Sequence, residues 1–183
     1  LSTTATASSN AGSYSITASG ASDVNYTITL QPGTLTISKA ALTIRADDKS
    51  KLYGAALPVM TATYSGFVNQ DTAASLDLPV SLSTSATSSS SAGTYPISLS
   101  GASDVNYTIT LAPGTLTITP AALTIRAEDK GKVYGAALPA LTAAYTGFVN
   151  QDTSASLDQP VSLSTTATAS SDVGSYPIVA SGA

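Results

Sequence analysis

Apolar and small polar residues alternate along much of the chain with a period of two. Tyr95, Ile97 and Leu99 alternate with Thr, Pro and Ser, and residues 107–111 and 116–118 continue the pattern with Tyr, Ile and Leu. Such alternation predicts strands with one buried and one solvated face, which is typical of antiparallel sheets. The fold class expected is therefore mostly β, with about six or seven short strands in each small sandwich or β-grasp-like sheet.

Turn signals separate these strands. Residues 112–115 read Ala-Pro-Gly-Thr, which favours a β-turn, either as a true hairpin or as a bend within a strand. The segment 70–76 is the one helix candidate in each repeat, and we expect it to form a single short helical turn with Asp71 as its N-cap.

The chain consists of tandem repeats. Residues 1–39 match residues 82–120 at 29 of 39 positions, and 40–102 match 121–183 at 47 of 63, without gaps and always 81 positions apart. We therefore divide the chain into a first repeat (1–39, a C-terminal half), a middle repeat (40–120, complete) and a third repeat (121–183, the N-terminal three-quarters). This pattern predicts a piece of a longer array.

The connections between repeats are short. Residues 117–125 run nearly from strand to strand without a flexible Gly-Ser stretch, so we expect the repeats to form an elongated, fairly stiff rod. The third repeat has no counterpart of residues 104–118. We therefore expect its free sheet edge to be frayed or paired with another chain.

Differences between the copies indicate which positions face the core. Leu52 is replaced by Val133, which keeps apolar character and predicts a core position. Leu78 is replaced by Gln159, which predicts an exposed one.

Composition excludes several classes of function. The sequence has no histidine and no cysteine, so the commonest general base, thiolate nucleophile and soft metal ligands are missing. The net charge of −4 opposes nucleic-acid binding. No apolar run approaches the ~20 residues of a membrane span. The segment that begins at Leu1 lacks the n-region and h-region of a signal peptide, so we expect any export signal to lie outside this piece. We expect no enzyme, no cofactor, no metal and no membrane insertion in this segment.

A specific set of motifs carries a family resemblance. These motifs are LTIRADDKSKLYG (42–54), LP (57–58), YSGFVNQDT (64–72), GTYPI (93–97), NYTI (106–109) and GTLTI (114–118). Together they resemble the MBG domain of the YGX type, across the whole chain. The resemblance implies large bacterial surface adhesins, including filamentous-haemagglutinin-like, two-partner-secreted proteins that hold biofilm cells to exopolysaccharide. It implies a Gram-negative cell-surface or biofilm-matrix location and no catalytic residues. A common family form has Gly at the positions of Gln70 and Gln151.

The leading hypothesis is that these repeats are a structural stalk that projects an adhesive region from the cell. The alternative is multivalent binding of exopolysaccharide or host glycan by the repeats themselves. Tyr107 and Tyr95 share strand faces with Ile and Leu, so we expect them in the core. Residues beside glycines near turns are the candidate carbohydrate contacts: Tyr53, Phe67, Tyr134 and Phe148.

Other sites are weaker candidates. A calcium site would draw on Asp47, Asp48, Asp71 and Asp77, but no spaced acidic loop is visible, and solvated carboxylates near Lys49, Lys51 or Arg45 are favoured. Asn25 and Asn106 match the glycosylation pattern and are interpreted as strand entries. A Lys–Asn crosslink from Lys49 or Lys51 to Asn69 is disfavoured, because the middle repeat has no glutamate and these lysines have the setting of loop residues. Nothing indicates a cleft for two-carboxylate hydrolysis.

Overall fold

The structure is a computed structural model that describes residues 1–182. It is built from β-strands with two single-turn 3-10 segments, so the mostly β fold class is confirmed. Within residues 1–182, no helix has the length and apolar character needed to cross a membrane. The chain divides into two compact units. Unit 1 comprises Leu1–Ser50, Pro58–Ser85 and Thr94–Thr117, and unit 2 comprises Lys51–Leu57, Ala86–Gly93 and Ile118–Ala183.

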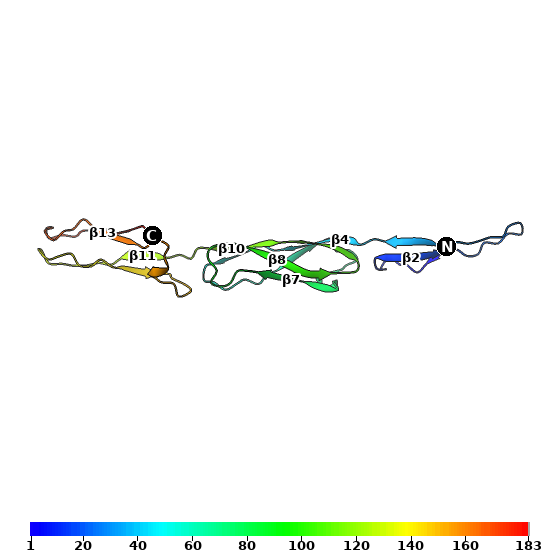
Figure 1. The fold of residues 1–183 in the computed structure, drawn as a ribbon, viewed down its shortest axis with the longest axis horizontal. Helices are drawn as coiled ribbons and strands as arrows, with labels where there is room; N and C mark the ends of the chain where they lie inside the picture. The colour runs from blue at the N-terminus through cyan, green and yellow to red at the C-terminus, as the bar shows by residue number, and fades with distance from the viewer. Residues whose placement is uncertain (183) are drawn as a thin grey trace. The chain divides into compact units, whose positions relative to one another are not determined.

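The middle repeat holds seven strands, in agreement with the number expected from the alternation. They are β4 (Ala40–Ala46), β5 (Lys49–Leu52), β6 (Ala62–Ser65), β7 (Leu78–Thr84), β8 (Gly93–Ser103), β9 (Tyr107–Ala112) and β10 (Gly114–Thr119). One sheet has the order β6-β4-β9 and the other the order β5-β10-β8-β7. In Figure 1 the green strands β7, β8 and β10 of the second sheet run beside one another.

The core of the middle repeat lies between these two sheets. Every second residue of β4 is fully buried, namely Leu42, Ile44 and Ala46. Val80 of β7 and Leu99 of β8 pack against the cluster around Leu42 from the other sheet. The period-two alternation therefore places one face of each strand in a common sandwich core.

The pairing of β4 with β9 departs from the expected antiparallel arrangement. β9 pairs with β4 in parallel, from Ala40 opposite Tyr107 to Arg45 opposite Ala112. The chain then changes sheets at Pro113, because β9 belongs to one sheet and β10 to the other. The turn is not a hairpin, because β9 and β10 do not pair; the two strands are separated by Pro113 alone, so the chain bends there from one sheet into the other. A strand that changes sheets in this way can meet a distant strand in parallel.

The first repeat forms a three-stranded sheet of order β1-β2-β3, with β1 at Ser2–Thr3, β2 at Gly12–Thr17 and β3 at Gly33–Ile37. These strands are counterparts of parts of β7, β8 and β10 in the 81-residue register. Residues 25–30, the counterpart of β9, form no strand and are exposed.

The third repeat forms two antiparallel pairs. β11 (Thr124–Ala127) pairs with β12 (Ala143–Thr146), and β13 (Ser162–Thr165) pairs with β14 (Ile178–Ser181). β11 is the counterpart of β4, but residues 121–123 are not in a strand, whereas residues 40–42 are. In β4 these residues pair with β9 alone. That the edge of the third repeat is frayed or paired with another chain stays a prediction.

Several local expectations need correction. The helical turn forms as the 3-10 segment η1 (Ala73–Ser75), and η2 (Ser154–Ser156) repeats it, but the N-cap is Thr72 rather than Asp71. Leu52 is 58% exposed and Val133 is 78% exposed, so the prediction of a core position there is wrong: the side chain lies on the open face of β5. Leu78 is 49% exposed, as expected.

Candidate functional site

A buried tyrosine and an aspartate form the main polar contact of the middle repeat. Tyr107, at the start of β9, is only 3% exposed, which confirms its expected core position. Its hydroxyl donates a hydrogen bond to Asp71 Oδ2 at 2.7 Å and accepts one from the Val68 backbone N–H at 3.0 Å. Burial raises the pKa of the Tyr107 hydroxyl, and the hydrogen bond to Asp71 raises it further. The neutral phenol thus ties β9 to the 68–71 turn.

An unusual turn positions Asp71. Its backbone N–H donates to the Val68 carbonyl at 2.9 Å, while Asn69 and Gln70 between them have φ values of 54° and 65°. Two successive left-handed residues are the signature of a type I′ turn, whose second central position favours glycine. Gln70 holds the left-handed conformation that a glycine would adopt without a Cβ penalty.

Asp152, the counterpart of Asp71 in the third repeat, accepts a hydrogen bond from the middle repeat. The Tyr53 hydroxyl, from the tip of the middle repeat, donates to Asp152 Oδ2 at 2.9 Å within unit 2. Gly54 lies so close to Val149 that an added Cβ would approach its side chain to 2.6 Å. Within the middle repeat, the Tyr53 backbone N–H donates to the Thr119 carbonyl at 2.8 Å. We name the contacts of Tyr53 with Asp152 and of Gly54 with Val149 the joint clasp.

The first and middle repeats are also linked by hydrogen bonds, in this case within unit 1. The side-chain amide of Asn106 accepts from the Ala11 N–H at 2.8 Å and donates to the Asn10 side chain at 3.1 Å. Lys39 Nζ donates to the Asp104 carbonyl at 3.1 Å. The Asn106 amide of the glycosylation pattern is thus engaged in protein contacts at a strand entry.

Lys51 is not a solvated loop lysine, contrary to expectation. It lies in β5 and is 8% exposed, and its amine donates to the carbonyls of Ala55 and Ser88, each at 2.9 Å. Its counterpart Lys132 donates to the Ala169 carbonyl at 3.0 Å. The long apolar stem can be buried because the charged end keeps hydrogen bonds to two backbone carbonyls.

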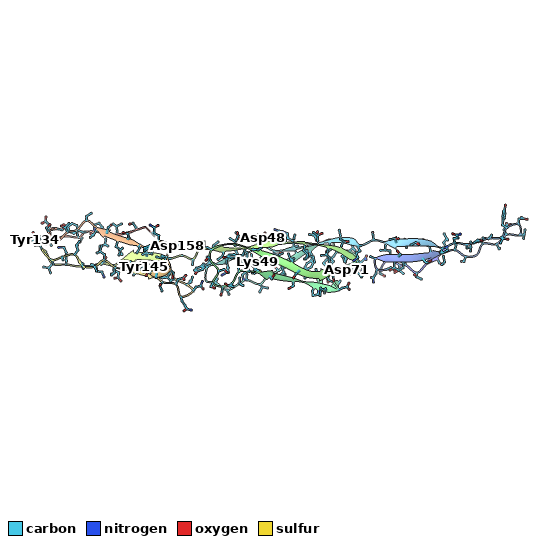
Figure 2. All side chains as sticks on the ribbon, viewed as in Figure 1. Asp48, Lys49, Asp71, Tyr134, Tyr145 and Asp158 are labelled. Atoms are coloured by element: carbon cyan, nitrogen blue, oxygen red, sulfur yellow. The ribbon has the colours of Figure 1, made fainter. Side chains whose placement is uncertain are left out.

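The acidic residues proposed for calcium are distributed over separate contacts. Asp47 accepts hydrogen bonds from the hydroxyls of Thr61 and Thr63, and these bonds, Thr61 first, lower its pKa below the ordinary value. Asp48 accepts from the Thr115 N–H and forms an exposed ion pair with Arg45. Figure 2 shows Asp48 and Asp71 toward opposite ends of the middle repeat. Across the described part of the chain, no three acidic side chains gather as metal ligands.

The four candidate carbohydrate contacts have different settings. Phe67 is half-buried and stacks on Tyr64 at 5.6 Å, with the edge of Tyr107 at 5.5 Å. Phe148 is likewise half-buried, 5.5 Å from Tyr145.

The two tyrosines of this set differ more sharply. Tyr53 takes part in the joint clasp, whereas Tyr134 is 63% exposed and lines a cavity of about 520 Å³ together with Tyr176. Figure 2 places Tyr134 at the far end of unit 2 from Tyr145. A carbohydrate role for these four residues stays a prediction.

The sequence profile of the MBG domain (YGX type) matches residues 1–36, 42–117 and 123–183. The chain belongs to the MBG domain family. Its MBG repeats follow one another along nearly the whole sequence, and the family is one of repeat domains of surface proteins. No curated protein and no solved structure matches the chain.

Sequence reasoning alone missed two roles in these MBG repeats. The sequence favours a cap or a metal ligand at Asp71 and a surface charge at Lys51. For Lys51 a signal is present, because Lys132 occupies the same position in the next copy while the residues on either side differ. Asp71 offers no such signal, since residues 68–72 and 149–153 are identical.

Proposed function

We propose that this chain is a stalk segment of a bacterial cell-surface or biofilm-matrix adhesin. Successive MBG repeats act as a spacer that projects an adhesive region away from a Gram-negative cell, and the chain itself carries no catalytic activity. Neighbouring repeats of the same chain are its first partners.

The joint clasp is the observation that carries this proposal. A spacer has to resist bending where one repeat meets the next. Here a hydrogen bond from Tyr53 to Asp152 and the close packing of Gly54 on Val149 hold two repeats together within unit 2. A flexible Gly-Ser connection would provide none of these contacts.

Small-angle scattering of the 183-residue chain tests the spacer directly. A compact globule of this length has a radius of gyration of about 16 Å. The stalk predicts a value well above that, together with a folded circular dichroism spectrum. A value near that of the globule would contradict the proposal.

A second candidate function is multivalent binding of exopolysaccharide or host glycan. It is favoured by the exposed ring of Tyr134 beside a cavity that Tyr176 also lines. Co-sedimentation of the chain with purified bacterial exopolysaccharide would test it, using Tyr134→Ala with Tyr26→Ala as an exposed tyrosine control. Binding lost only in Tyr134→Ala would support this function, and equal binding by both variants would remove Tyr134 from it.

A further inference from the structure

We propose that the middle repeat is built to carry tension along the chain, with the parallel pairing of β4 and β9 as its mechanical clamp. The inference goes beyond the stalk function, because a spacer has to hold a distance but need not resist pulling. It rests on the strand pairing within one repeat whose seven strands, and the residues before and after them, all belong to the chain.

A pulling force enters and leaves the middle repeat through its first and last strands. β4 follows Lys39 directly, and β10 ends at Thr119, one residue before the end of the repeat. Between them the load crosses a single ladder, from β4 to β9, because β9 continues into β10 through Pro113 alone. The β4–β9 ladder therefore lies on the shortest path that tension takes through the repeat.

The parallel direction of this pair determines how the force acts on it. At the start of both strands Ala40 lies opposite Tyr107. At the other end Arg45 lies opposite Ala112. The force pulls β4 from its start and β9 from its end, so the two strands are drawn along each other in opposite directions. All six residue pairs of the register resist together, because the hydrogen bonds of a parallel ladder are evenly spaced along it.

Both strands that take up the load are interior strands of their sheets. β4 lies between β6 and β9, and β10 lies between β5 and β8. Among residues 1–182, the largest fully buried side chains are Leu42, Ile44, Ile97, Leu116 and Ile118. All of these except Ile97 belong to β4 or β10. Drawing out either strand would therefore expose apolar surface and break hydrogen bonds on both of its edges.

The change of sheet after β9 adds a second restraint. An added Cβ at Gly114 would lie 2.5 Å from the Ala46 carbonyl oxygen, so the start of β10 passes directly against the end of β4. Just beyond that point, the Thr115 backbone N–H donates to the Asp48 side chain at 2.8 Å. Sliding of β4 along β9 therefore has to disrupt this close packing as well as the ladder.

Single-molecule pulling of the full chain in two directions tests the clamp. The sequence has no cysteine, so introduced cysteines at exposed positions give unique attachment points. Ser38→Cys with Pro120→Cys loads the ladder along its strands, whereas Ser38→Cys with Val105→Cys pulls the starts of β4 and β9 apart, one bond after another. We expect a several-fold larger unfolding force in the first direction. The length released identifies the event, because residues 40–119 span at most about 260–290 Å when fully extended.

A proline variant tests the ladder itself. The Ala40 N–H donates to the Asn106 carbonyl at 2.8 Å, at the end of the pair where the force on β4 arrives. Proline is tolerated at the first residue of a strand, so Ala40→Pro removes this donor while the sheet still forms, which circular dichroism would verify. We expect Ala40→Pro to lower the unfolding force in the first direction. Tyr53→Phe is the control, because it weakens the joint clasp and leaves the ladder intact.

Two results of the directional comparison would overturn the proposal: equal unfolding forces in both directions, or extension along the strands without a resolved unfolding event. This comparison stands even if Ala40→Pro does not fold. An unfolding force that a folded Ala40→Pro leaves unchanged, or that Tyr53→Phe lowers equally, would also overturn the clamp at β4 and β9. Because the attachment points enclose one repeat, the clamp can fail while the stalk function holds, and the reverse.

Discussion

Tyr53 and Asp152 belong to different MBG repeats, and the Tyr53 hydroxyl donates a 2.9 Å hydrogen bond to the Asp152 carboxylate. In the middle repeat, the counterpart Asp71 receives the hydroxyl of Tyr107 instead. Asp71 thus receives a hydroxyl from its own repeat, and Asp152 receives one from the repeat before it. The bond to Asp152 is a contact between neighbouring repeats, through which a short repeat can gain stability from its neighbour.

Removing the Tyr53 hydroxyl should weaken the joint. A hydrogen bond to a charged group contributes about 1.5–3 kcal/mol and a neutral one about 1, so we expect Tyr53→Phe to lower the free energy of unfolding of unit 2 by about 1–2 kcal/mol. Urea unfolding of the wild-type chain and of Tyr53→Phe measures this difference in free energy. Tyr134→Phe is the control, because Tyr134 is the counterpart of Tyr53 but is 63% exposed. Equal losses in both variants would contradict a specific role of the Tyr53–Asp152 bond.

The raised pKa of the Tyr107 hydroxyl predicts that the free energy of unfolding falls at alkaline pH. Burial, then the hydrogen bond to Asp71, raises its pKa above the ordinary 10.0 in the folded state. The unfolded chain therefore releases this proton at a lower pH, so the stabilisation is complete below pH 10 and declines as the pH rises through the folded pKa. Unfolding curves from pH 7 to pH 11 would measure the decline.

Two variants isolate the contribution of Tyr107. In Tyr107→Phe the alkaline decline should be smaller, at the cost of about 1 kcal/mol at neutral pH for the lost hydrogen bond. Tyr26→Phe should leave the profile unchanged, because Tyr26 is 74% exposed. An identical alkaline profile in wild type and Tyr107→Phe would assign the decline to other groups.

Replacing Gln70 by glycine should stabilise the middle repeat. Gln70 has a φ of 65°, in the left-handed region that costs a residue with a Cβ about 1–2 kcal/mol. The greater freedom of glycine in the unfolded chain offsets part of that gain, so we expect a net increase of about 0.5–1 kcal/mol in the free energy of unfolding. Gln31→Gly, at a position without positive φ, should give no increase. A destabilised Gln70→Gly chain would indicate that the Gln70 side chain makes a stabilising contact.

Much of the sandwich was predictable from alternation. Leu42, Ile44, Leu116 and Ile118 lie on period-two faces, and all four are buried. Alternation reports which face of a strand is buried, but it does not report which strand lies beside it. The parallel pairing of β4 with β9 was therefore missed, since it depends on the change of sheet at Pro113.

The polar contacts were less predictable for a related reason. Lys51 reads as a surface charge because lysine is seldom buried, and only the three-dimensional positions of the Ala55 and Ser88 carbonyls explain its burial. The sequence predicts a helix cap at Asp71 because a helical turn follows it. Its real partner, Tyr107, is 36 residues away in the sequence, beyond the reach of local patterns.

A pair of glycines isolates the packing of the joint from backbone strain. Gly54 and Gly135 are counterparts, and each has a φ of +81°. A Cβ at Gly54 would meet Val149 at 2.6 Å, whereas nothing lies within 4 Å of a Cβ at Gly135. Both alanine variants should lose about 1–2 kcal/mol from left-handed strain, and Gly54→Ala should lose about 1–3 kcal/mol more because Val149 must move. Thermal and urea unfolding of the two variants measure the difference. Equal losses would mean that the tip of the middle repeat does not rest on Val149, and the Tyr53–Asp152 hydrogen bond would then hold the joint without that packing.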